Sequence, residues 1–453
     1  MMTTDQARTA FPGGWILPDD IDYDEARSTF NGTIDRRPAV VIRPTSTEEV
    51  AAAVRWARGE GLPIAVRGGG HNVAGHATAD DAAVIDLRHL RDVVVDPERR
   101  RVRVGGGAIW NDVDAATVPH GLAMTGGTFG DTGVGGLALG GGLGFLMGTN
   151  GLTCDHLVGA EVVTADGSVV IAGDGGDPDL LWALRGGGGN FGIVTAFEFA
   201  LHPLGPLHSG FLIYPIEAAR DVLEGVAALA AVMPPEMVLF VTGPHLPEDD
   251  PTPGGPLTMS VTVVFQGPAE TGDALIAPLR AIGTVEDSVG PKTYLEVQAA
   301  SGVLPFGLRH YWKGHFVREL DPHVIDATLH AMASRPGVVS FMLIEAMSGV
   351  ARQEPPGGAA FGQRGAGWNI SGIAIWEDPA DDAEQIAWSR RYADALLPAS
   401  LSGAGYANYA PVDETPDRVR AAYGPERYAR LTAIKRRYDP DNVFRYNLNI
   451  RPE

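Results

Sequence analysis

The chain has 453 residues, 45% of them hydrophobic, and a formal net charge of −21 at pH 7. This length predicts two or three domains with a sizeable core, and the acidic balance argues against nucleic acid or an anionic membrane as a partner, because both are bound through clusters of Lys and Arg. The single cysteine, Cys154, excludes a disulfide framework and a multi-cysteine metal site, and the lack of a membrane-length apolar run or an export pattern predicts a cytoplasmic protein, for which we expect no bound metal.

The first elements lead into a glycine-rich loop. Residues 1–37 are polar and rich in acids, which predicts an arm that lies over the surface. The apolar run 38–42 predicts a strand, and the capping box at residues 46–49 opens a helix. A second strand at 64–66 completes a β-α-β unit that ends at the loop.

The loop at residues 67–76 reads RGGGHNVAGH and is the most informative stretch of the sequence. Its three consecutive glycines, 68–70, allow the backbone to take positive φ and to press close to a ligand. Successive N–H groups in such a turn can converge on a phosphate or pyrophosphate. His71 follows directly, so its imidazole is expected beside whatever the loop holds. Taken alone, the loop is equally compatible with an ordinary glycine turn and an incidental histidine.

The rest of the first half alternates short strands with two helices and three more glycine clusters. Residues 125–144 hold too much glycine for a helix that is stable on its own, and we expect them to wrap a ligand a second time. Asp166-Gly167 between two apolar runs predicts a hairpin. The predicted strands are 83–87, 93–95, 102–104, 161–165, 168–172 and 193–201, the helices are 109–117 and 179–184, and the glycine clusters are 105–107, 126–144 and 186–192.

A second domain is predicted after residue 206, where glycine becomes rarer. Longer strands then alternate with single amphipathic helices, which is typical of an antiparallel sheet covered on one face. The predicted strands are 210–214, 238–242, 258–265, 310–317, 338–346 and 368–376, and the helices are 217–232, 269–281, 322–334 and 382–396. From residue 404 the chain is rich in aromatic residues and asparagine, and after a helix at 425–438 it is expected to return to the first domain. The predicted class is α+β, with domains at 1–206 (core about 36–206), 207–403 and 404–453.

Four stretches carry further information when they are taken together: RGGGHNVAGH (67–76), GDTGVGGLALGGGLG (130–144), LLWALRGGGGNFGIVTAFEF (180–199) and YDPDNVFRYNLNI (438–450). In this order and at these separations they resemble the FAD-linked oxidases of the vanillyl-alcohol-oxidase superfamily, and within it the berberine-bridge-enzyme-like branch. The resemblance covers nearly the whole chain. It implies FAD as the cofactor and a bipartite PCMH-type FAD-binding domain, into which a substrate domain of antiparallel sheet covered by helices is inserted.

By this resemblance, the glycine loops bind FAD, and His71 would carry a single covalent bond from its imidazole to the C8 methyl carbon of the flavin. Many relatives hold a second flavin bond through a cysteine just before the GVGG run, where this chain has Phe129 or Gly130. Cys154 is instead expected to be a buried small residue. The other cofactor-binding residues implied are Arg67, Gly68, Gly69, Gly70, Asn72, Thr132, Gly133, Gly135, Gly136, Gly140, Gly192, Ile193, Tyr446 and Asn447.

Oxidation of an alcohol also needs a base, and two residues are candidates. Tyr409 lies in an Asn-Tyr motif whose tyrosine is the base in several relatives; this role needs neighbours that lower its pKa from about 10, and a core tyrosine at a domain seam is the alternative. Glu345 interrupts an apolar strand, so it is either a base with a raised pKa or half of a buried ion pair with an arginine. Asn369 and Ser371 alternate on one face of their strand, where relatives place polar groups that assist the base.

The reaction implied is hydride transfer from a small natural-product alcohol or amine to a covalently bound flavin, which O₂ reoxidises with release of H₂O₂. Three alternatives stay open. The chain also resembles the enterocin-type flavin oxygenases, which predicts an oxygenase or cyclase of a polyketide intermediate that works through a flavin N5-oxide. A sugar oxidase is less favoured by a single attachment. A flavoprotein without catalysis is the third. The expected partners are a small-molecule substrate and O₂.

Overall fold

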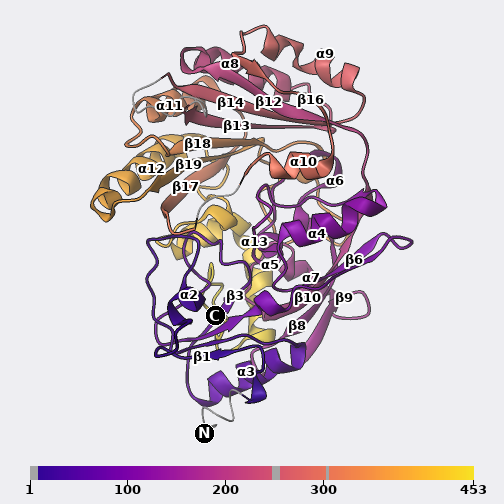
Figure 1. Ribbon diagram of the computed structural model, residues 1–453, viewed down its shortest axis with the longest axis vertical. Coiled ribbons are helices and arrows are strands. Elements are labelled where there is room, and N and C mark those ends of the chain that lie inside the picture. Colours follow the sequence, from indigo (N-terminus) through magenta and orange to yellow (C-terminus); the bar gives the residue numbers. More distant parts are fainter. Residues whose placement is uncertain (1–8, 247–255, 303–305) are drawn as a thin grey trace.

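The computed structural model describes residues 9–246, 256–302 and 306–453. It combines helices with several mainly antiparallel sheets, which confirms the α+β class. Figure 1 shows a lower part, built from the N-terminal elements and the C-terminal helix, and an upper part built around one long sheet. None of the described helices is long and apolar enough to cross a membrane.

The first sheet contains the predicted β-α-β unit. Its strands are, in spatial order, β1 (Trp15–Ile16), β2 (Val40–Ile42), β4 (Ala83–Asp86) and β3 (Ile64–Arg67). β2 and β3 both pair with β4 in parallel, and α3 (Thr47–Gly59) connects them. Ser46 caps α3 by accepting a hydrogen bond from the Glu49 N–H at 3.2 Å. The Glu49 carboxylate accepts from the Thr45 N–H instead of the Ser46 N–H, so only half of the capping box forms.

The second sheet is antiparallel. Its strands are, in spatial order, β5 (Val93–Asp96), β6 (Arg101–Gly105), β10 (Ile193–Ala200), β8 (Leu157–Val163) and β9 (Val169–Gly173). β8 and β9 form the predicted hairpin, and Gly167 takes the left-handed conformation, with φ of +79°, that this turn requires. The remaining elements of this part are α4 (Trp110–Thr117), α5 (Val134–Leu139), α6 (Met147–Asn150), α7 (Pro178–Leu184) and the pair β7 (Leu122–Ala123) and β11 (His202–Pro203). α5 has only six residues and lies inside the glycine-rich run, with glycine turns on both sides.

The third sheet is the long one in the upper part. Its strands are, in spatial order, β15 (Glu286–Asp287), β12 (Leu207–Pro215), β14 (Thr258–Gln266), β13 (Met237–His245), β18 (Phe341–Ala346), β19 (Trp368–Trp376) and β17 (Arg309–Val317), with β16 (Gly290–Lys292) also beside β12. All pairs are antiparallel. The sheets fall on either side of residue 206, while the domain boundaries stay predictions.

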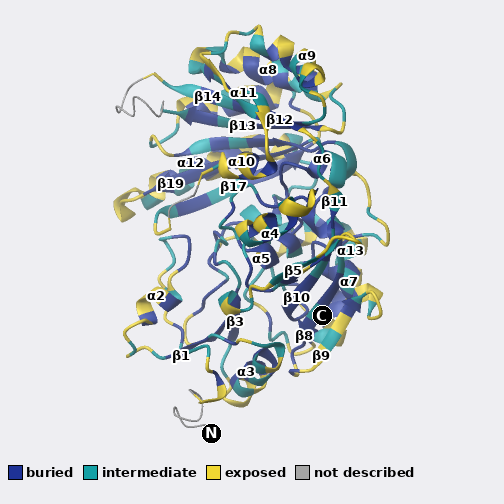
Figure 2. Cartoon of the chain, turned by 45° about the vertical axis from the view of Figure 1, so that its right-hand side comes forward, coloured by how far each residue is buried: buried dark blue, intermediate teal, exposed yellow. Residues whose placement is uncertain are grey.

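Helices cover one face of this sheet, as predicted. They are α8 (Ala219–Ala230), α9 (Ala269–Arg280), α11 (Pro322–Ala333) and α12 (Asp382–Leu396). Figure 2 shows the strands mostly buried, with exposed residues gathered on α8 and α9. The opposite face turns toward the lower part: Phe240 and Phe316 of the sheet share a core with Leu143 and Phe145. α10 (Tyr294–Ala299) also packs into the core that these four residues share.

The C-terminal segment packs against the lower part of the molecule. α13 (Pro416–Tyr438) breaks at Gly424, just before Pro425, so the predicted helix is its second half. Leu431 and Ile434 pack into the core of the second sheet. The fully buried Lys435 ammonium donates to the Asn190 carbonyl at 2.8 Å, and it also bonds to the segment that follows α13. Figure 1 shows α13 in yellow among the purple N-terminal elements.

Residues 9–37 differ from the predicted surface arm. They contribute β1 and α2 (Tyr23–Arg27), and Phe11 and Phe30 are fully buried. The physical reason is that aromatic residues are interspersed among the acids, and each buries enough apolar area to hold the segment down. Average polarity over the stretch hides these anchors.

Candidate functional site

A cavity of about 590 Å³ lies between the glycine loops of the lower part and the face of the long sheet that is opposite the helices α8, α9, α11 and α12. Loops from all over the first half of the chain and the C-terminal tail line it. The predicted cofactor-binding residues that line the cavity are Gly68, Gly69, Gly70, His71, Asn72, Thr132, Gly133, Gly135, Gly136, Gly140, Gly192, Ile193, Tyr446 and Asn447. The structure therefore brings together residues that lie up to nearly four hundred positions apart.

Two of the glycine loops touch back to back. A Cβ on Gly69 would lie 2.5 Å from the Gly133 nitrogen, and a Cβ on Gly133 would lie 2.4 Å from the Gly69 nitrogen. Only glycine permits this approach on both sides. Gly136, by contrast, has open space where its Cβ would be. We call these two loops, around Gly69 and Gly133, the glycine cradle. They present backbone without side chains to the cavity, and the N–H groups of such a surface can bind an anion.

His71 follows the first of these loops and turns its imidazole into the cavity wall. Its Nε2 lies 3.3 Å from Asp131 Oδ2, close enough for an ion pair. Its ring stacks on Phe30 with centroids 4.9 Å apart, and Phe306 meets it edge-on at 5.2 Å. His71 Nε2, Asp131 Oδ1 and Asn447 Oδ1 are buried without a hydrogen-bond partner among the described residues. Buried polar atoms are normally satisfied, so these atoms point to a missing polar ligand.

Arg67 is the one predicted cofactor residue that does not line the cavity. Side chains alternate along β3, so Ile64 and Val66 face the cavity and Arg67 faces away from it. Its guanidinium is buried and donates to the Ala26 carbonyl at 2.7 Å. Burial lowers the Arg67 pKa to about 10, and Asp86 nearby offsets part of this effect. The guanidinium anchors the N-terminal segment.

On the sheet side of the cavity, Glu345, Asn369 and Tyr409 form one hydrogen-bonded group. Glu345 lies on β18, Asn369 pairs with it on β19, and Tyr409 comes from the short 3-10 helix η8 (Ala407–Tyr409). Asn369 Nδ2 donates to Glu345 Oε2 at 2.5 Å, and the Tyr409 hydroxyl donates to Oε1 at 3.2 Å. Glu345 and Tyr409 line the cavity. The predicted bases therefore lie side by side and share a proton network.

Burial raises the pKa of Glu345 to about 7, and the hydrogen bonds from Asn369 and Tyr409 limit the rise. Among the described residues no arginine forms an ion pair with Glu345, so the structure offers no support for the ion-pair interpretation. The expectation of a lowered pKa for Tyr409 is wrong for this structure: burial raises it well above 10, and the neighbouring Glu345 and Tyr406 raise it further. The required cation beside the phenol is absent from the described residues around it. Near neutral pH, Tyr409 is therefore a neutral hydrogen-bond donor to Glu345, whose carboxyl has a pKa close to that pH.

Some of the remaining residues of the long sheet line the cavity, whereas others are buried behind its wall. Ser371 lies on the cavity face two residues after Asn369, but it is buried opposite Leu343 and Gly314 and does not line the cavity. Among the aromatic residues of β17, Trp312 lines the cavity and meets Tyr409 edge-on at 5.4 Å. The other cavity-facing residues of the sheet are Phe211, Phe240, Thr242, His245, Thr262, Phe341, Leu343 and Ile373.

Sequence reasoning missed Tyr406 and the supporting role of Asn408. The Tyr406 hydroxyl accepts from the Gly142 N–H at 2.8 Å and from the Leu143 N–H at 3.2 Å, and Asn408 Nδ2 donates to it at 2.8 Å. Asn408 also donates to the Leu137 carbonyl at 3.0 Å. These bonds fix the second glycine run against the segment that carries Tyr409. The stretch GYANY, residues 405–409, places two tyrosines and an asparagine close together, and this cluster could have identified both residues from the sequence.

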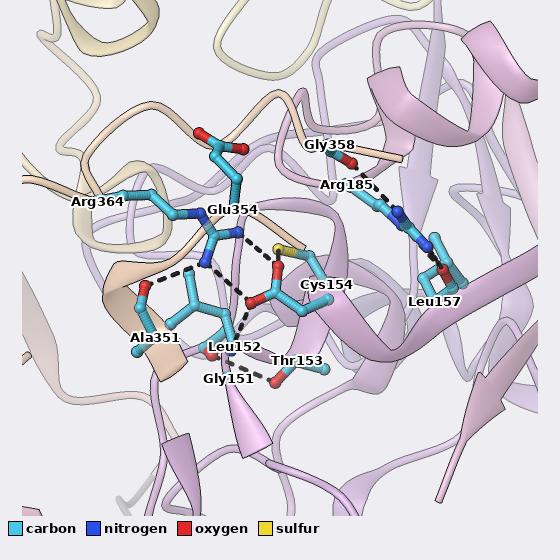
Figure 3. A network of polar contacts seen from close by, with 12 residues as sticks. Gly151, Leu152, Thr153, Cys154, Leu157, Arg185, Ala351, Glu354, Gly358 and Arg364 are labelled. Carbon is cyan, nitrogen blue, oxygen red and sulfur yellow. Dashed lines mark hydrogen bonds and ion pairs between the residues drawn. The ribbon is translucent and has the colours of Figure 1, made fainter. Parts of the chain in front are cut away.

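Cys154 is fully buried, as predicted, and it does not line the cavity. Figure 3 shows it in a polar network, where its Sγ donates to Asp155 Oδ1 at 3.5 Å. Asp155 forms a buried ion pair with Arg364, with Nη2 at 2.5 Å and Nη1 at 2.9 Å. Burial raises the pKa of the Cys154 thiol. Of the two residues predicted at the second attachment position, Phe129 lines the cavity and Gly130 does not.

The chain resembles known proteins over nearly its whole length. Residues 38–173 match the model of the FAD binding domain family, and residues 405–451 match the berberine and berberine-like family. The chain is 33% identical to (R)-6-hydroxynicotine oxidase of Paenarthrobacter nicotinovorans, over 97% of both chains. The crystal structure of 6-hydroxy-D-nicotine oxidase from Arthrobacter nicotinovorans superposes with a TM-score of 0.88 at 32% identity, covering 97% of this chain and 98% of that one. Xylooligosaccharide oxidase from Myceliophthora thermophila superposes at 0.85 with 25% identity, over 99% of both chains.

Proposed function

Since the chain belongs to the berberine-bridge-enzyme-like family of FAD-linked oxidoreductases, we propose that it oxidises a small, mainly apolar alcohol or amine with FAD attached covalently to His71, and that dioxygen takes up the electrons and leaves as hydrogen peroxide. The observation that carries this proposal is the placement of Glu345 and Tyr409 on the wall of the same cavity as the glycine cradle and His71.

The residues present fit FAD. The paired backbones at Gly69 and Gly133 leave no room for side chains, and an anion such as a pyrophosphate is bound by backbone of this kind. No Lys or Arg of the described chain lines the cavity, so backbone N–H groups would carry this role. Asn447 Oδ1 and His71 Nε2 make no hydrogen bond to the described chain and are polar atoms available to the ring. Gly68, Gly70 and Asn72 would hold the cofactor beside His71.

When bound, FAD supplies the acceptor for the two electrons of the oxidation. Glu345 takes the proton of the substrate hydroxyl or ammonium, and a pKa of about 7 suits a general base at neutral pH. Asn369 and Tyr409 hold the carboxylate in place by donating to its two oxygens. The aromatic wall of Trp312 and Phe240 excludes water and orients an apolar substrate.

The lining supports an amine or alcohol over a sugar. Glu345 is the only acid among the described lining residues, and without lining Lys or Arg the cavity has no fixed cation for an anionic substrate. Sugars need many hydrogen-bonding groups, whereas four aromatic residues dominate the sheet wall. The relative of highest similarity named above is an oxidase of 6-hydroxynicotine, and we extend this class, a heteroaromatic ring that carries an amine, to the present chain.

Three measurements test the proposal. The purified yellow protein is screened in air for peroxide with panels of nicotine-like amines, aryl alcohols, sugars and polyketides; sugar turnover alone would refute the substrate class. With ¹⁸O₂, an oxidase leaves the product unlabelled, whereas label in the product would identify an oxygenase. Acid precipitation then reports the attachment: the flavin colour stays in the pellet, His71→Ala releases it, and the control Cys154→Ser keeps it. A protein that is photoreduced but oxidises nothing in the panels would instead be a flavoprotein without catalysis.

A further inference from the structure

Residues 30–32, which the sequence places in a polar N-terminal stretch, lie against the loop that carries His71. The Phe30 N–H donates to the Gly70 carbonyl at 3.1 Å, immediately before His71. Asn31 Nδ2 donates to the Val73 carbonyl at 2.6 Å, two residues after His71. We term residues 30–32 the clasp. It holds the backbone on both sides of His71.

The other side of the clasp binds the start of β17, in the upper part of the molecule. Asn31 Oδ1 accepts from the His310 N–H at 2.9 Å, while its Nδ2 donates to the His310 carbonyl at 2.9 Å. The Gly32 N–H donates to the Leu308 carbonyl at 2.7 Å. A Cβ on Gly32 would lie 2.1 Å from the Gly307 carbonyl oxygen, so the contact requires glycine. The clasp therefore ties the His71 loop to the sheet that carries Glu345.

The side chain of Phe30 fixes the plane of the His71 ring. Phe30 is fully buried, and its ring stacks on His71 at 4.9 Å with an interplanar angle of 15° and on His310 at 4.3 Å with 26°. The exposed Phe306 closes one edge of the imidazole, and Asp131 lies 3.3 Å from its Nε2. The flat Phe30 ring against the imidazole face keeps the imidazole from tilting out of its plane. Because Asp131 also lies beside Nε2, the ring nitrogens of His71 keep a defined direction.

We propose that the clasp positions His71 for the attachment of the flavin, with Phe30 as the positioning residue. This inference rests on the proposed covalent cofactor. In the attachment, an imidazole N–H bond and a C–H bond of the flavin methyl group break and an N–C bond forms. The two electrons and two protons released pass to dioxygen, which leaves as hydrogen peroxide. Phe30 takes no part in these bonds; it keeps the imidazole within reach and in line.

The test compares three variants. Phe30→Ala removes the ring, and Phe30→Leu keeps most of the apolar volume but not the flat face. Phe11→Ala is the matched control, because Phe11 is equally buried in the same N-terminal segment and its ring stacks on Trp15 at 5.5 Å, not on His71. Full-length protein from riboflavin-limited cells is incubated with FAD in air, and acid-stable flavin is measured over time. FAD retained without acid treatment and the urea midpoint report folding.

Both Phe30 variants are expected to retain FAD but to attach it on the order of a hundredfold more slowly than the wild type, because a displacement of about 1 Å costs this much in an oriented reaction. Phe11→Ala is expected to lose stability and to keep the wild-type rate. If Phe30→Leu attaches flavin as fast as Phe11→Ala, the positioning role is overturned, and this variant decides the question if Phe30→Ala does not fold. No acid-stable flavin in the wild type would instead overturn the covalent cofactor itself.

Discussion

Replacing Glu345 by glutamine keeps the shape of the side chain and removes a carboxyl whose pKa burial raises from 4.5 to about 7. Each pKa unit corresponds to about 1.4 kcal/mol, so the whole difference amounts to about 3 kcal/mol. The folded protein holds this proton more tightly than the unfolded chain, so the contribution to stability is full below pH 4.5 and is lost as the pH rises to about 7. About 2 kcal/mol of the loss falls between pH 5.5 and 8, a range above the isoelectric point of about 4.9.

The assay is urea unfolding of the wild type and Glu345→Gln at pH 5.5 and pH 8. Relative to the wild type, the free energy of unfolding of the variant is expected to rise by about 2 kcal/mol from pH 5.5 to pH 8. Glu161→Gln is the control, because hydrogen bonds from Thr47 and Thr195 and the charge of Arg103 outweigh burial and lower the pKa of Glu161 from 4.5. This carboxyl is therefore ionised in both the folded and the unfolded chain from pH 5.5 to pH 8, and the variant is expected to keep the same free-energy difference from the wild type at both values.

The same substitution tests catalysis. Loss of a general base lowers kcat by roughly 10²- to 10⁴-fold, and the rise of kcat/KM with pH, centred near 7 in the wild type, disappears. Full activity of Glu345→Gln would refute the role of base, and a stability relative to the wild type that is the same at both pH values would refute the raised pKa.

Three further substitutions have defined outcomes. Asn369→Leu removes a hydrogen bond that favours the charged Glu345, so the rise of kcat/KM is expected to move to higher pH; an unchanged profile would contradict this. Gly69→Ala places a Cβ 2.5 Å from the backbone of the facing loop, and the purified protein is expected to carry little flavin at 450 nm; full flavin content would show that the loops can part. Arg364→Met leaves Asp155 buried and unpaired, which costs about 3–5 kcal/mol in urea unfolding, whereas Arg364→Met with Asp155→Leu is expected to recover most of this; equal losses in both would speak against the ion pair.

The glycine loops could be predicted from the sequence because their chemistry is local. Three glycines before His71 and the run around Gly133 report close backbone approach wherever they occur. The structure adds what a single stretch does not contain, namely that the two loops face each other. Arg67 shows the limit: its residue type suits a pyrophosphate, but the two-residue period of β3 turns it away, and only the exact strand register reveals this.

The acid–base group could be predicted only in part. Glu345 is conspicuous in an apolar strand, and its burial follows from that pattern. Whether an arginine or an amide faces it depends on cross-strand register, which paired it with Asn369. The pKa of Tyr409 depends on the sign of its neighbours, and the nearest is a carboxyl. Phe30 escaped notice because a lone aromatic residue in an acidic stretch carries no periodic signal.

The walls of the cavity come from both ends of the chain: residues 64–77 build one side, whereas residues 406–409 and 444–448 build another. A ribosome emits these segments hundreds of codons apart, so the binding chamber lacks one wall until residues 406–448 have been made. Cofactor loading must therefore wait for these later segments, and a nonsense mutation at Tyr446, which removes Tyr446 and Asn447, would yield a colourless product while sparing the side of the site built by residues 64–77.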